Sequence, residues 1–287
     1  MEMEENKTVL LVDFYNLVYR TLHVAFYQVP EDTEFQYWKY LMINSLFASL
    51  KQFKPNKVIF AIDMYNSWRK KIYKEYKANR KEQRDKSKID YKKFYEVLDD
   101  FILNYKKHFS NIYFLRINEA EGDDVIATIC KSKFEDYKKI IISGDEDFIQ
   151  LLQYKNVKIF NPNKKDFTTV LNPKIQLELK ILTGDKSDNI SAVKPKCGIK
   201  TAEKILNSGL DVFLQDEVIN DKYKINRQLI DFEYIPSDIS KRICEDFDNY
   251  ELKKPNAMKI LMWFGQNKIN KFSDEFSFYF SLLEKLN

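Results

Sequence analysis

Val9-Leu10-Leu11-Val12-Asp13 is a short apolar run that ends in an aspartate, and the same pattern occurs twice more. The other two stretches are Val58-Ile59-Phe60-Ala61-Ile62-Asp63 and Ile140-Ile141-Ile142-Ser143-Gly144-Asp145. Short, β-rich apolar runs without alternation are typical of strands buried on both faces, as in a parallel sheet. Ligands bind such sheets beyond the carboxyl ends of the strands. We therefore expect three carboxylates at one edge of one sheet.

Carboxylates gathered at one edge repel one another, and this repulsion is the first indication of a ligand. Two like charges about 4 Å apart repel by roughly 4 kcal/mol at an effective dielectric constant of about 20. A cation bound between them removes that penalty, whereas without one the carboxyl groups must take up protons. The three aspartates therefore predict a metal site.

The composition is that of a folded protein of about two domains. Hydrophobic residues make up 44% of the 287, with 22 Phe and 18 Tyr, which is enough for a substantial core. The three cysteines are odd in number and far apart, so they offer neither a disulfide framework nor a Cys-x-x-Cys zinc site. Residues 1–5 are acidic and polar, and no apolar run approaches the length of a membrane span. We expect a cytoplasmic protein with no membrane contact.

Histidine chemistry has little material in this chain. There are two histidines, His23 and His108, and His108 follows two lysines in a polar helical stretch. Surface or packing roles are the expectation for both, and a serine triad is correspondingly disfavoured. Any chemistry is expected to depend on carboxylates.

The positive charge is concentrated in one segment. Between Arg69 and Lys93 there are twelve Lys or Arg and four acids, a net charge of about +8. Arg69, Tyr73, Lys77 and Arg80 fall at helical spacing, which predicts one face of alternating cations and aromatic rings. Such a run is usually a solvated helix face. Here it directly follows the Asp63 strand, so we expect it to contact the phosphates of a nucleic acid.

Further acids lie at predicted helix starts and turns. Glu121, Asp123 and Asp124 open an apolar helix, where they also serve as good capping residues. Asp145 and Asp147 follow the third strand, and Asp185 and Asp188 are three apart in a turn. The candidate ligands are Asp13, Asp63, Glu121, Asp123, Asp124, Asp145, Asp147, Asp185 and Asp188.

This ligand set contains only hard oxygen donors, which select Mg²⁺, or Mn²⁺ in its place, over zinc. Nine carboxylates are enough for two ions. Two-metal sites catalyse in-line attack of water on a phosphodiester. The residues alone therefore indicate phosphodiester hydrolysis.

Six segments together resemble the flap endonuclease or 5′-nuclease family, and within it the phage RNase H branch. In chain order they are LLVDFYNLVYR, FAIDMYNSWRKKIYKEYKANR, EAEGDDVIA, IISGDEDFIQLL, LTGDKSDNI and GIKTAEKIL. They cover roughly residues 8–207, and residues 228–236 resemble the carboxyl-terminal region of the phage enzyme. The resemblance implies a two-metal nuclease that acts at the 5′ side of nicked, flapped or RNA-primed duplexes. Its activities would be 5′-3′ exonuclease, flap endonuclease and ribonuclease H, with removal of RNA primers in phage DNA replication.

The resemblance also implies a role for each acid. Five would serve a first ion: Asp13, Asp63, Glu121, Asp123 and Asp145. Three would serve a second ion, Asp147, Asp185 and Asp188, with Asp145 near both. Asp124 falls in the same motif as Asp123 and shares its expected role, because family members differ over which of the two is acidic.

Nucleic-acid contacts are implied in two places. Lys77 and Arg80 match basic residues that touch the scissile phosphate at the base of a helical arch, so they are candidate catalytic residues together with Asp145. Tyr76 matches an aromatic residue that stacks on a base. Residues 184–206 match a helix-hairpin-helix-like element that grips duplex backbone around a K⁺ ion. Its candidate contacts are Lys194, Lys196, Gly198, Lys200 and Thr201.

This element departs from the family pattern. The hairpin has one extra residue, and Lys196 stands in place of the first glycine. Fewer glycines mean less tolerance for positive φ and for close approach of the backbone. The departure weighs against the K⁺ site, while the lysines could compensate through phosphate contacts.

The expected fold is an α/β core with a mostly parallel twisted sheet flanked by helices, the PIN-like 5′-nuclease arrangement. This core would cover residues 1–183, with the basic arch at about 66–95. A mostly helical duplex-binding domain would follow over residues 184–287. We expect a monomer, in the host cytoplasm if the gene is that of a phage.

Primer removal implies replication partners, such as a single-strand-binding protein and a sliding clamp. Residues 276–280, Phe-Ser-Phe-Tyr-Phe, resemble a clamp-binding peptide, although an amphipathic element packed on the core explains them equally well.

Three alternatives have distinct signatures. A PIN-like ribonuclease shares the acidic edge and usually lacks the 184–206 element. A non-catalytic branched-DNA-binding protein on the same fold does not need all nine acids. The 5′-nuclease domain of a DNA polymerase is disfavoured because the sequence has no room for a polymerase.

Overall fold

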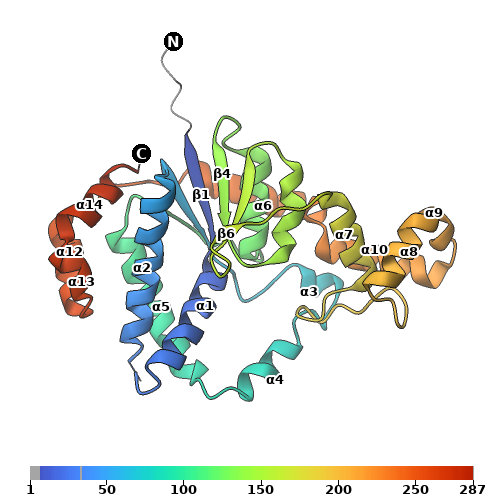
Figure 1. The fold of residues 1–287 in the computed structure, drawn as a ribbon, viewed down its shortest axis with the longest axis horizontal. Coiled ribbons are helices and arrows are strands. Elements are labelled where there is room, and N and C mark those ends of the chain that lie inside the picture. The colour runs from blue at the N-terminus through green and yellow to red at the C-terminus, as the bar shows by residue number, and fades with distance from the viewer. Residues whose placement is uncertain (1–6, 33, 287) are drawn as a thin grey trace, which may run out of the picture.

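One six-stranded sheet forms the centre of the computed structural model, which describes residues 7–32 and 34–286. The strand order is β3-β2-β1-β4-β5-β6, and all neighbours are parallel except the antiparallel pair β5 and β6 (Figure 1). The strands are β1 (Thr8–Asp13), β2 (Lys57–Ala61), β3 (Tyr113–Leu115), β4 (Lys138–Ile142), β5 (Val157–Asn161) and β6 (Asp166–Phe167). The predicted α/β fold with a mostly parallel sheet is confirmed.

The register of the sheet brings the three aspartate-bearing strands to the same edge. Val12 of β1 pairs with Phe60 of β2 on one side and with Ile142 of β4 on the other. All six residues of β1 are buried, as expected for a central strand covered on both faces. Asp13, Asp63 and Asp145 therefore lie at or just beyond three adjacent strand ends.

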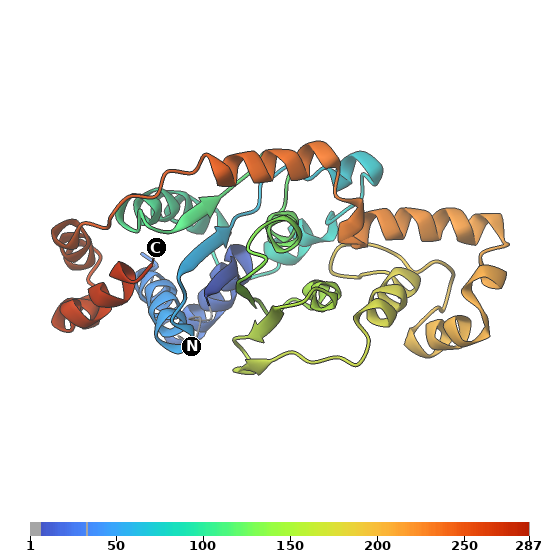
Figure 2. The same cartoon turned by 90° about the horizontal axis from the view of Figure 1, so that it is seen from above.

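Helices cover both faces of the sheet (Figures 1 and 2). The helices up to residue 153 are α1 (Phe14–Gln28), α2 (Gln36–Phe53), α3 (Arg69–Ile72), α4 (Asn79–Asp85), α5 (Tyr91–His108), α6 (Gly122–Ser132) and the 3-10 helix η1 (Glu146–Gln153). Those that follow are α7 (Pro173–Thr183), α8 (Ile199–Ser208), α9 (Leu210–Phe213), α10 (Glu217–Ile230), η2 (Phe232–Tyr234), α11 (Ser237–Asp248), α12 (Ala257–Gln266), α13 (Asn270–Asp274) and α14 (Phe276–Glu284).

One face of the sheet carries an aromatic core built by α1, α2 and α5. Trp38 is fully buried there, with its ring centroid 5.0 Å from that of Phe94 and 4.9 Å from that of Phe101. Edge and tilted contacts at these separations stabilise the core beyond the burial of area alone. The opposite face packs against α6, η1 and α11, which contribute a second buried cluster. The sheet is thus held between two helical layers.

The carboxyl-terminal helices contribute residues to three hydrophobic clusters. Residues of α7, α8 and α10 form a cluster of their own at one end of the molecule (Figure 2). Ile239 and Ile243 of α11 return to the second face of the sheet, and Phe264 of α12 packs into the aromatic core. The expected domain boundary after residue 183 falls at Gly184, the C-cap of α7.

The stretch 276–280 begins α14. Phe276, Tyr279 and Phe280 pack against the aromatic core, and the Phe47 and Tyr279 ring centroids are 4.8 Å apart. These contacts support the packing explanation of the stretch. None of the helices in the described part of the chain is long and apolar enough to cross a membrane.

The basic segment does not form one continuous helix, so the prediction of a single cationic helical face is wrong. α3 ends at Ile72, Tyr73 is extended, and Lys77 takes a positive φ of 57°. The Lys77 N–H donates to the carbonyl of Asp188 (2.9 Å), and this bond ties the segment to the turn at 185–190. The segment therefore forms an arch from α3 through α4 to α5 (Figure 1).

Candidate active site

Each of the three strand-end aspartates is oriented by hydrogen bonds. Asp13 caps α1 by accepting the N–H of Asn16 (3.0 Å), and its other oxygen accepts the Ser143 hydroxyl (2.8 Å). Asp145 caps η1 by accepting the N–H of Asp147 (2.9 Å). Asp63 accepts the N–H of Gly122 at the start of α6. Helix capping therefore fixes each carboxylate where its strand ends.

Gly122 is required for this arrangement. A Cβ at this position would lie 2.9 Å from an Asp63 oxygen and 3.0 Å from the carbonyl oxygen of Ala61. The first distance is shorter than a Cβ atom normally shows, and the second is tighter than most Cβ contacts and involves a backbone carbonyl, which cannot rotate away. Glycine thus lets α6 start directly against the end of β2, which brings Asp123 to the acidic edge.

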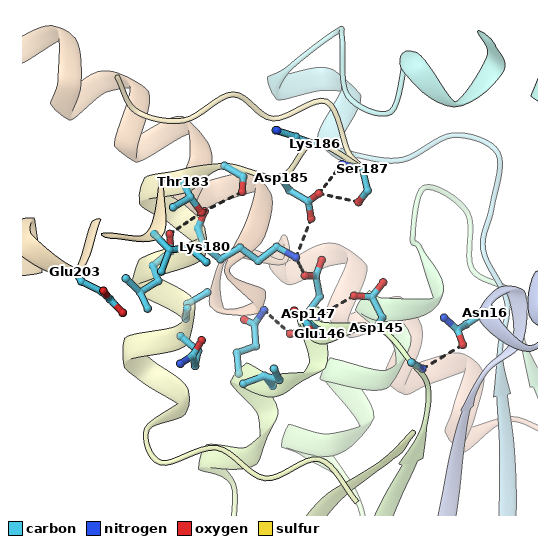
Figure 3. A pocket seen from close by; sticks show the side chains of 18 residues that line it. Asn16, Asp145, Glu146, Asp147, Lys180, Thr183, Asp185, Lys186, Ser187 and Glu203 are labelled. Atoms are coloured by element: carbon cyan, nitrogen blue, oxygen red, sulfur yellow. Dashed lines mark hydrogen bonds and ion pairs between the residues drawn. The ribbon is translucent and has the colours of Figure 1, made fainter. Parts of the chain in front are cut away.

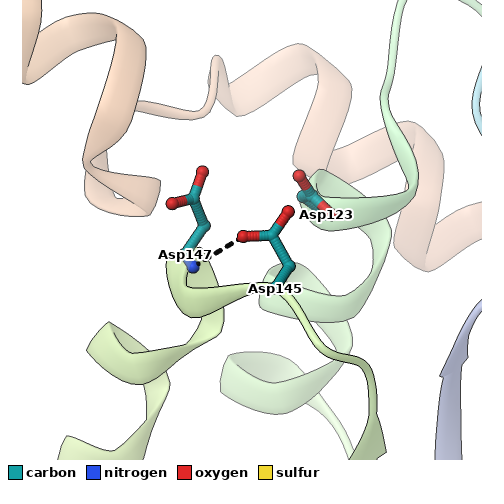
Figure 4. Close-up of side chains that lie close together, drawn as sticks. All are labelled: Asp123, Asp145 and Asp147. Atoms are coloured by element: carbon teal, nitrogen blue, oxygen red, sulfur yellow. Dashed lines mark hydrogen bonds between the residues drawn. The ribbon is translucent and has the colours of Figure 1, made fainter. Parts of the chain in front are cut away.

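Two groups of three aspartates meet at this edge. Asp123, Asp145 and Asp147 each offer a carboxylate oxygen within 4.8 Å of the others (Figure 4). Asp147 belongs also to the second group, with Asp185 and Asp188, under the same limit. The structure therefore brings five of the predicted ligands into two overlapping groups. Asp147 is the residue common to both groups, whereas the resemblance implied that Asp145 would lie near both ions.

Asp147 and Asp185 of the second group border a cavity of about 640 Å³, together with Asp145 (Figure 3). Lys180, on the last turn of α7, lies between Asp147 and Asp185 and forms ion pairs with both, at 2.8 Å from Asp185. Sequence reasoning missed Lys180, because a lysine at the end of a helix is ordinary there.

The pKa shifts divide the acids into two sets. Burial, and then the charge of Asp63, raise the pKa of Asp13 to about 7. Burial likewise raises the pKa values of Asp63, Asp123 and Asp145. These four carboxyl groups lack enough cationic partners within the described residues to stay ionised at low cost.

The other set is neutralised by side chains. Burial opposes ionisation of Glu121, but Lys77 and Arg69 outweigh it and lower its pKa to about 2. The pKa of Asp185 is also about 2, because Lys180 outweighs the effect of burial. The charge that an added cation would balance therefore sits around Asp13, Asp63, Asp123 and Asp145. This is a donor set suited to a hard divalent ion.

Asp124 and Arg69 form an internal ion pair, so the structure does not support metal ligation by Asp124 or nucleic-acid contact by Arg69. Asp124 is completely buried, and its oxygens accept hydrogen bonds from Arg69 Nη2 (2.8 Å) and Trp68 Nε1 (3.0 Å). Arg69 also donates to Glu121 (2.9 Å) and to the carbonyl of Leu229 (2.8 Å). These bonds occupy the guanidinium and attach the start of the arch to α6 and α10.

The other arch residues also face inward. The Tyr76 hydroxyl lies 2.9 Å from both a Glu121 and an Asp188 oxygen, and the side chain is 3% exposed. Base stacking by Tyr76 is not supported by this position. Lys77 forms an ion pair with Glu121, and Arg80 Nη2 lies 2.8 Å from Asp188. Lys77 and Arg80 are thus at the acidic edge, as predicted, and are paired with its carboxylates.

The remaining predicted contacts lie on and before α8, toward the far end of the molecule in Figure 1. Lys196 and Lys200 are exposed, and Lys196 takes a positive φ of 58° in the place where a glycine was expected. Gly198 is the N-cap of α8, and Lys200 and Thr201 lie in the first turn of that helix. The Lys194 ammonium is 4.9 Å from the Phe213 ring centroid. Tyr73, by contrast, packs on the α7–α8–α10 cluster.

We predict that Arg69→Met lowers the free energy of unfolding by about 3–5 kcal/mol, because it leaves the buried Asp124 without its partner. Urea denaturation measures this change. Lys70→Met is the matched control, since Lys70 is the exposed neighbour in the same helix. A loss below about 1 kcal/mol would contradict the internal role of the ion pair.

We predict that the metal-free protein loses stability as pH rises from about 5 to about 8. Asp13 has a raised pKa, so the folded state holds a proton that the unfolded state releases, at about 1.4 kcal/mol per pKa unit. The lowered pKa values of Glu121 and Asp185 change the stability only at pH values below this range. Denaturation in EDTA at several pH values tests the slope, which Asp13→Asn should reduce. Unchanged stability across this range would contradict the prediction.

We predict that Lys180→Met tightens divalent-ion binding by about tenfold, because the ammonium competes for Asp147 and Asp185. Calorimetric titration with Mn²⁺ measures the affinity directly. Lys174→Met, an exposed position on the same helix, is the control and should leave the affinity unchanged. Equal affinities in the two variants would show that Lys180 does not occupy a metal position.

Comparison with known proteins agrees with this geometry. Residues 8–180 match the family model described as 5′-3′ exonuclease, N-terminal resolvase-like domain, and residues 201–279 match the model described as T4 RNase H, C terminal. The ribonuclease H of Enterobacteria phage T4 is 30% identical, over 96% of this chain and 98% of that protein. A 5′-3′ exonuclease of Mycoplasmopsis pulmonis is 31% identical, over 71% of this chain and 67% of its own length.

Solved structures share the fold. The bacteriophage T5 D15 flap endonuclease, in a pseudo-enzyme-product complex with DNA and metal ions, aligns with a TM-score of 0.69 at 21% identity. The alignment covers 85% of this chain and 99% of that structure. The T5 5′-exonuclease with bound zinc aligns with a TM-score of 0.66 over the same shares of the two chains.

Proposed function

This chain belongs to the 5′-3′ exonuclease family, and we propose that it is a divalent-metal-dependent 5′ nuclease that hydrolyses phosphodiesters in nicked, flapped or RNA-primed duplexes. The observation that carries the proposal is the pair of overlapping aspartate groups beneath a basic arch. Acids with raised pKa values mark where cations belong, and lysines beside them mark where a phosphate would approach. Removal of RNA primers in phage replication is the finer proposal, supported by the relative named ribonuclease H.

Metal ions, when bound, supply a nucleophilic hydroxide at neutral pH and stabilise the charge on the leaving oxygen. We assign a first ion to Asp13, Asp63, Asp123 and Asp145, and a second ion to Asp147, Asp185 and Asp188. Mg²⁺ is the ion we propose, and Mn²⁺ a substitute, because all these donors are carboxylate oxygens. Glu121 is already bonded to Lys77, Arg69 and Tyr76, so we assign it to the orientation of Lys77.

The protein's own part is to position the strand and balance its charge. Lys77 and Arg80 are held at the acidic edge by carboxylates, and both have a raised pKa, so they stay charged. When a phosphate enters, these cations can pair with it in place of a carboxylate. A charge-assisted bond to phosphate also aligns the scissile bond. Lys77 and Arg80 are therefore the proposed phosphate-positioning residues.

We assign the duplex to the exposed lysines before and on α8. Lys196 and Lys200 can neutralise backbone phosphates, independently of sequence, at a distance from the reaction. A K⁺ ion is not part of the proposal, since Lys196 stands where the family has a glycine.

We predict that Asp145→Asn or Asp188→Asn lowers Mg²⁺-dependent cleavage by at least about 10³-fold while substrate binding persists, because each removes a charged ligand. The assay uses a 5′-labelled flap and an RNA-primed nicked duplex, with Mg²⁺ and with EDTA. Asp136→Asn, at an exposed position after α6, is the control.

The size of the products separates exonuclease from flap cutting. Wild-type protein that binds both substrates tightly and cleaves neither would establish a binding module instead. Cleavage confined to single-stranded RNA would favour a PIN-like ribonuclease. Full activity in either aspartate variant would refute the assignment of the two metal groups.

A further inference from the structure

Tyr65 is an exposed aromatic residue two positions after Asp63, on the loop 62–68 that joins β2 to the arch. Its side chain is 66% exposed. The loop itself is fixed, because the N–H groups of Ile62, Met64 and Trp68 donate to carbonyls between residues 115 and 120 (2.9–3.2 Å). The Asn66 side chain adds a bond to Asn118 (3.1 Å). Tyr65 is therefore presented to solvent from a well-anchored backbone.

One face of the Tyr65 ring is supported by a cation. The guanidinium carbon of Arg116 lies 5.4 Å from the ring centroid, which is cation–π distance. Arg116 Nε is buried and has no hydrogen-bond partner within the described residues. Within the described residues, no ion pair joins the Arg116 guanidinium to a carboxylate, so its charge lies against the ring. Both the aromatic face and the positive charge remain available to a ligand.

The ring lies close to the acidic edge. Two extended residues span at most about 7 Å, so the backbone of Tyr65 is within that distance of Asp63. Burial raises the pKa of Tyr15 and Tyr65 adds to the effect, while Arg116 lowers it and Asp63 raises it further. Four groups from α1, the ends of β2 and β3, and the loop therefore share one neighbourhood.

Aromatic residues continue from this point along the arch. Tyr15 contacts Tyr19 on α1, with ring centroids 5.8 Å apart. The Tyr19 hydroxyl lies 2.9 Å from that of Tyr95 on α5, and Arg84 of α4 donates to Tyr95 (3.1 Å). Tyr15 is buried in the core, so these contacts join the acidic edge to the far limb of the arch by packing, and Tyr65 is the exposed ring beside them.

We propose that Tyr65, backed by Arg116, is a stacking subsite for one unpaired nucleobase of the strand whose phosphate lies at the acidic edge. This inference rests on the proposed function and adds a positioning residue to it. A phosphate near Asp63 places its neighbouring base within reach of Tyr65. Stacking on a ring is tolerant of base identity, so the subsite accepts RNA and DNA alike. The cation–π contact with Arg116 stabilises the position of the ring, and the charge of Arg116 attracts the adjacent phosphate.

The test combines Tyr65→Ala with substrates in which single nucleotides of the unpaired strand are abasic. Binding is measured by fluorescence anisotropy of a labelled flap, with Ca²⁺ as the divalent ion. We expect Tyr65→Ala and one abasic position to weaken binding by about 5- to 100-fold each, the range of one stacked base. Together they should weaken it no further than either alone, because both remove the same contact.

Three controls separate stacking from a general defect. Tyr65→Phe keeps the ring and should retain sensitivity to the abasic position. Tyr27→Ala, at an 81% exposed tyrosine near the end of α1, should bind the flap like wild type. A duplex without the unpaired strand should bind Tyr65→Ala and wild type equally.

Additive effects of Tyr65→Ala and every abasic position would overturn the inference. So would an equal loss of affinity for the flap and for the duplex that lacks it. Failure of the proposed function is a separate result, since it would show as absence of Mg²⁺-dependent cleavage by the wild-type protein.

Discussion

Mutual repulsion of carboxylates crowded at the carboxyl edge of the sheet is the constraint on which the rest of the structure depends. Parallel strands β1, β2 and β4 end side by side, so Asp13, Asp63 and Asp145 cannot avoid one another. The protein balances part of this charge with its own cations from the arch and α7. The acids nearest the strand ends keep raised pKa values. The site is therefore incompletely neutralised by the folded chain, which is the condition for binding added cations.

The Arg69–Asp124 ion pair shows how the same residue types serve two purposes. Asp123 and Asp124 are neighbours on the first turn of α6, and helix geometry points their side chains in different directions. Asp123 faces the acidic edge, while Asp124 faces Trp68 and Arg69 and caps the helix start through the N–H of Glu121. The first holds charge for a ligand, and the second fixes the arch to the core. The two side chains differ in burial, and the local sequence does not show which of the two is buried.

Sequence patterns sufficed for the three strands β1, β2 and β4 and for the acids at their ends, whereas β3, β5 and β6 were not predicted. Apolar runs that end in aspartate depend only on strand geometry, so Asp13, Asp63 and Asp145 could be placed together in advance. The arch could not be predicted in the same way. Helical spacing suggested one cationic face, but the backbone breaks at Tyr73 and turns at Lys77 to bond the carbonyl of Asp188. That bond joins residues more than 100 positions apart, and no local pattern records it. Lys180 was missed for the same reason, because its partner Asp147 is contributed by another element.

Cation exchange links these observations. In the metal-free protein, Asp188 lies 3.8 Å from Lys77 and pairs with Arg80, and Asp147 and Asp185 pair with Lys180; all three carboxylates are assigned to the second ion. Divalent ions that bind these carboxylates release the ammonium and guanidinium groups, and a substrate phosphate supplies the negative charge to receive them. Either exchange alone leaves some of these charged groups with fewer partners, so each exchange is less favourable alone than together with the other. Metal and phosphate binding at this edge should therefore be mutually reinforcing, with the arch as the element that changes partners. By thermodynamic linkage, the factor by which metal binding raises the affinity for phosphate must equal the factor by which phosphate binding raises the affinity for metal.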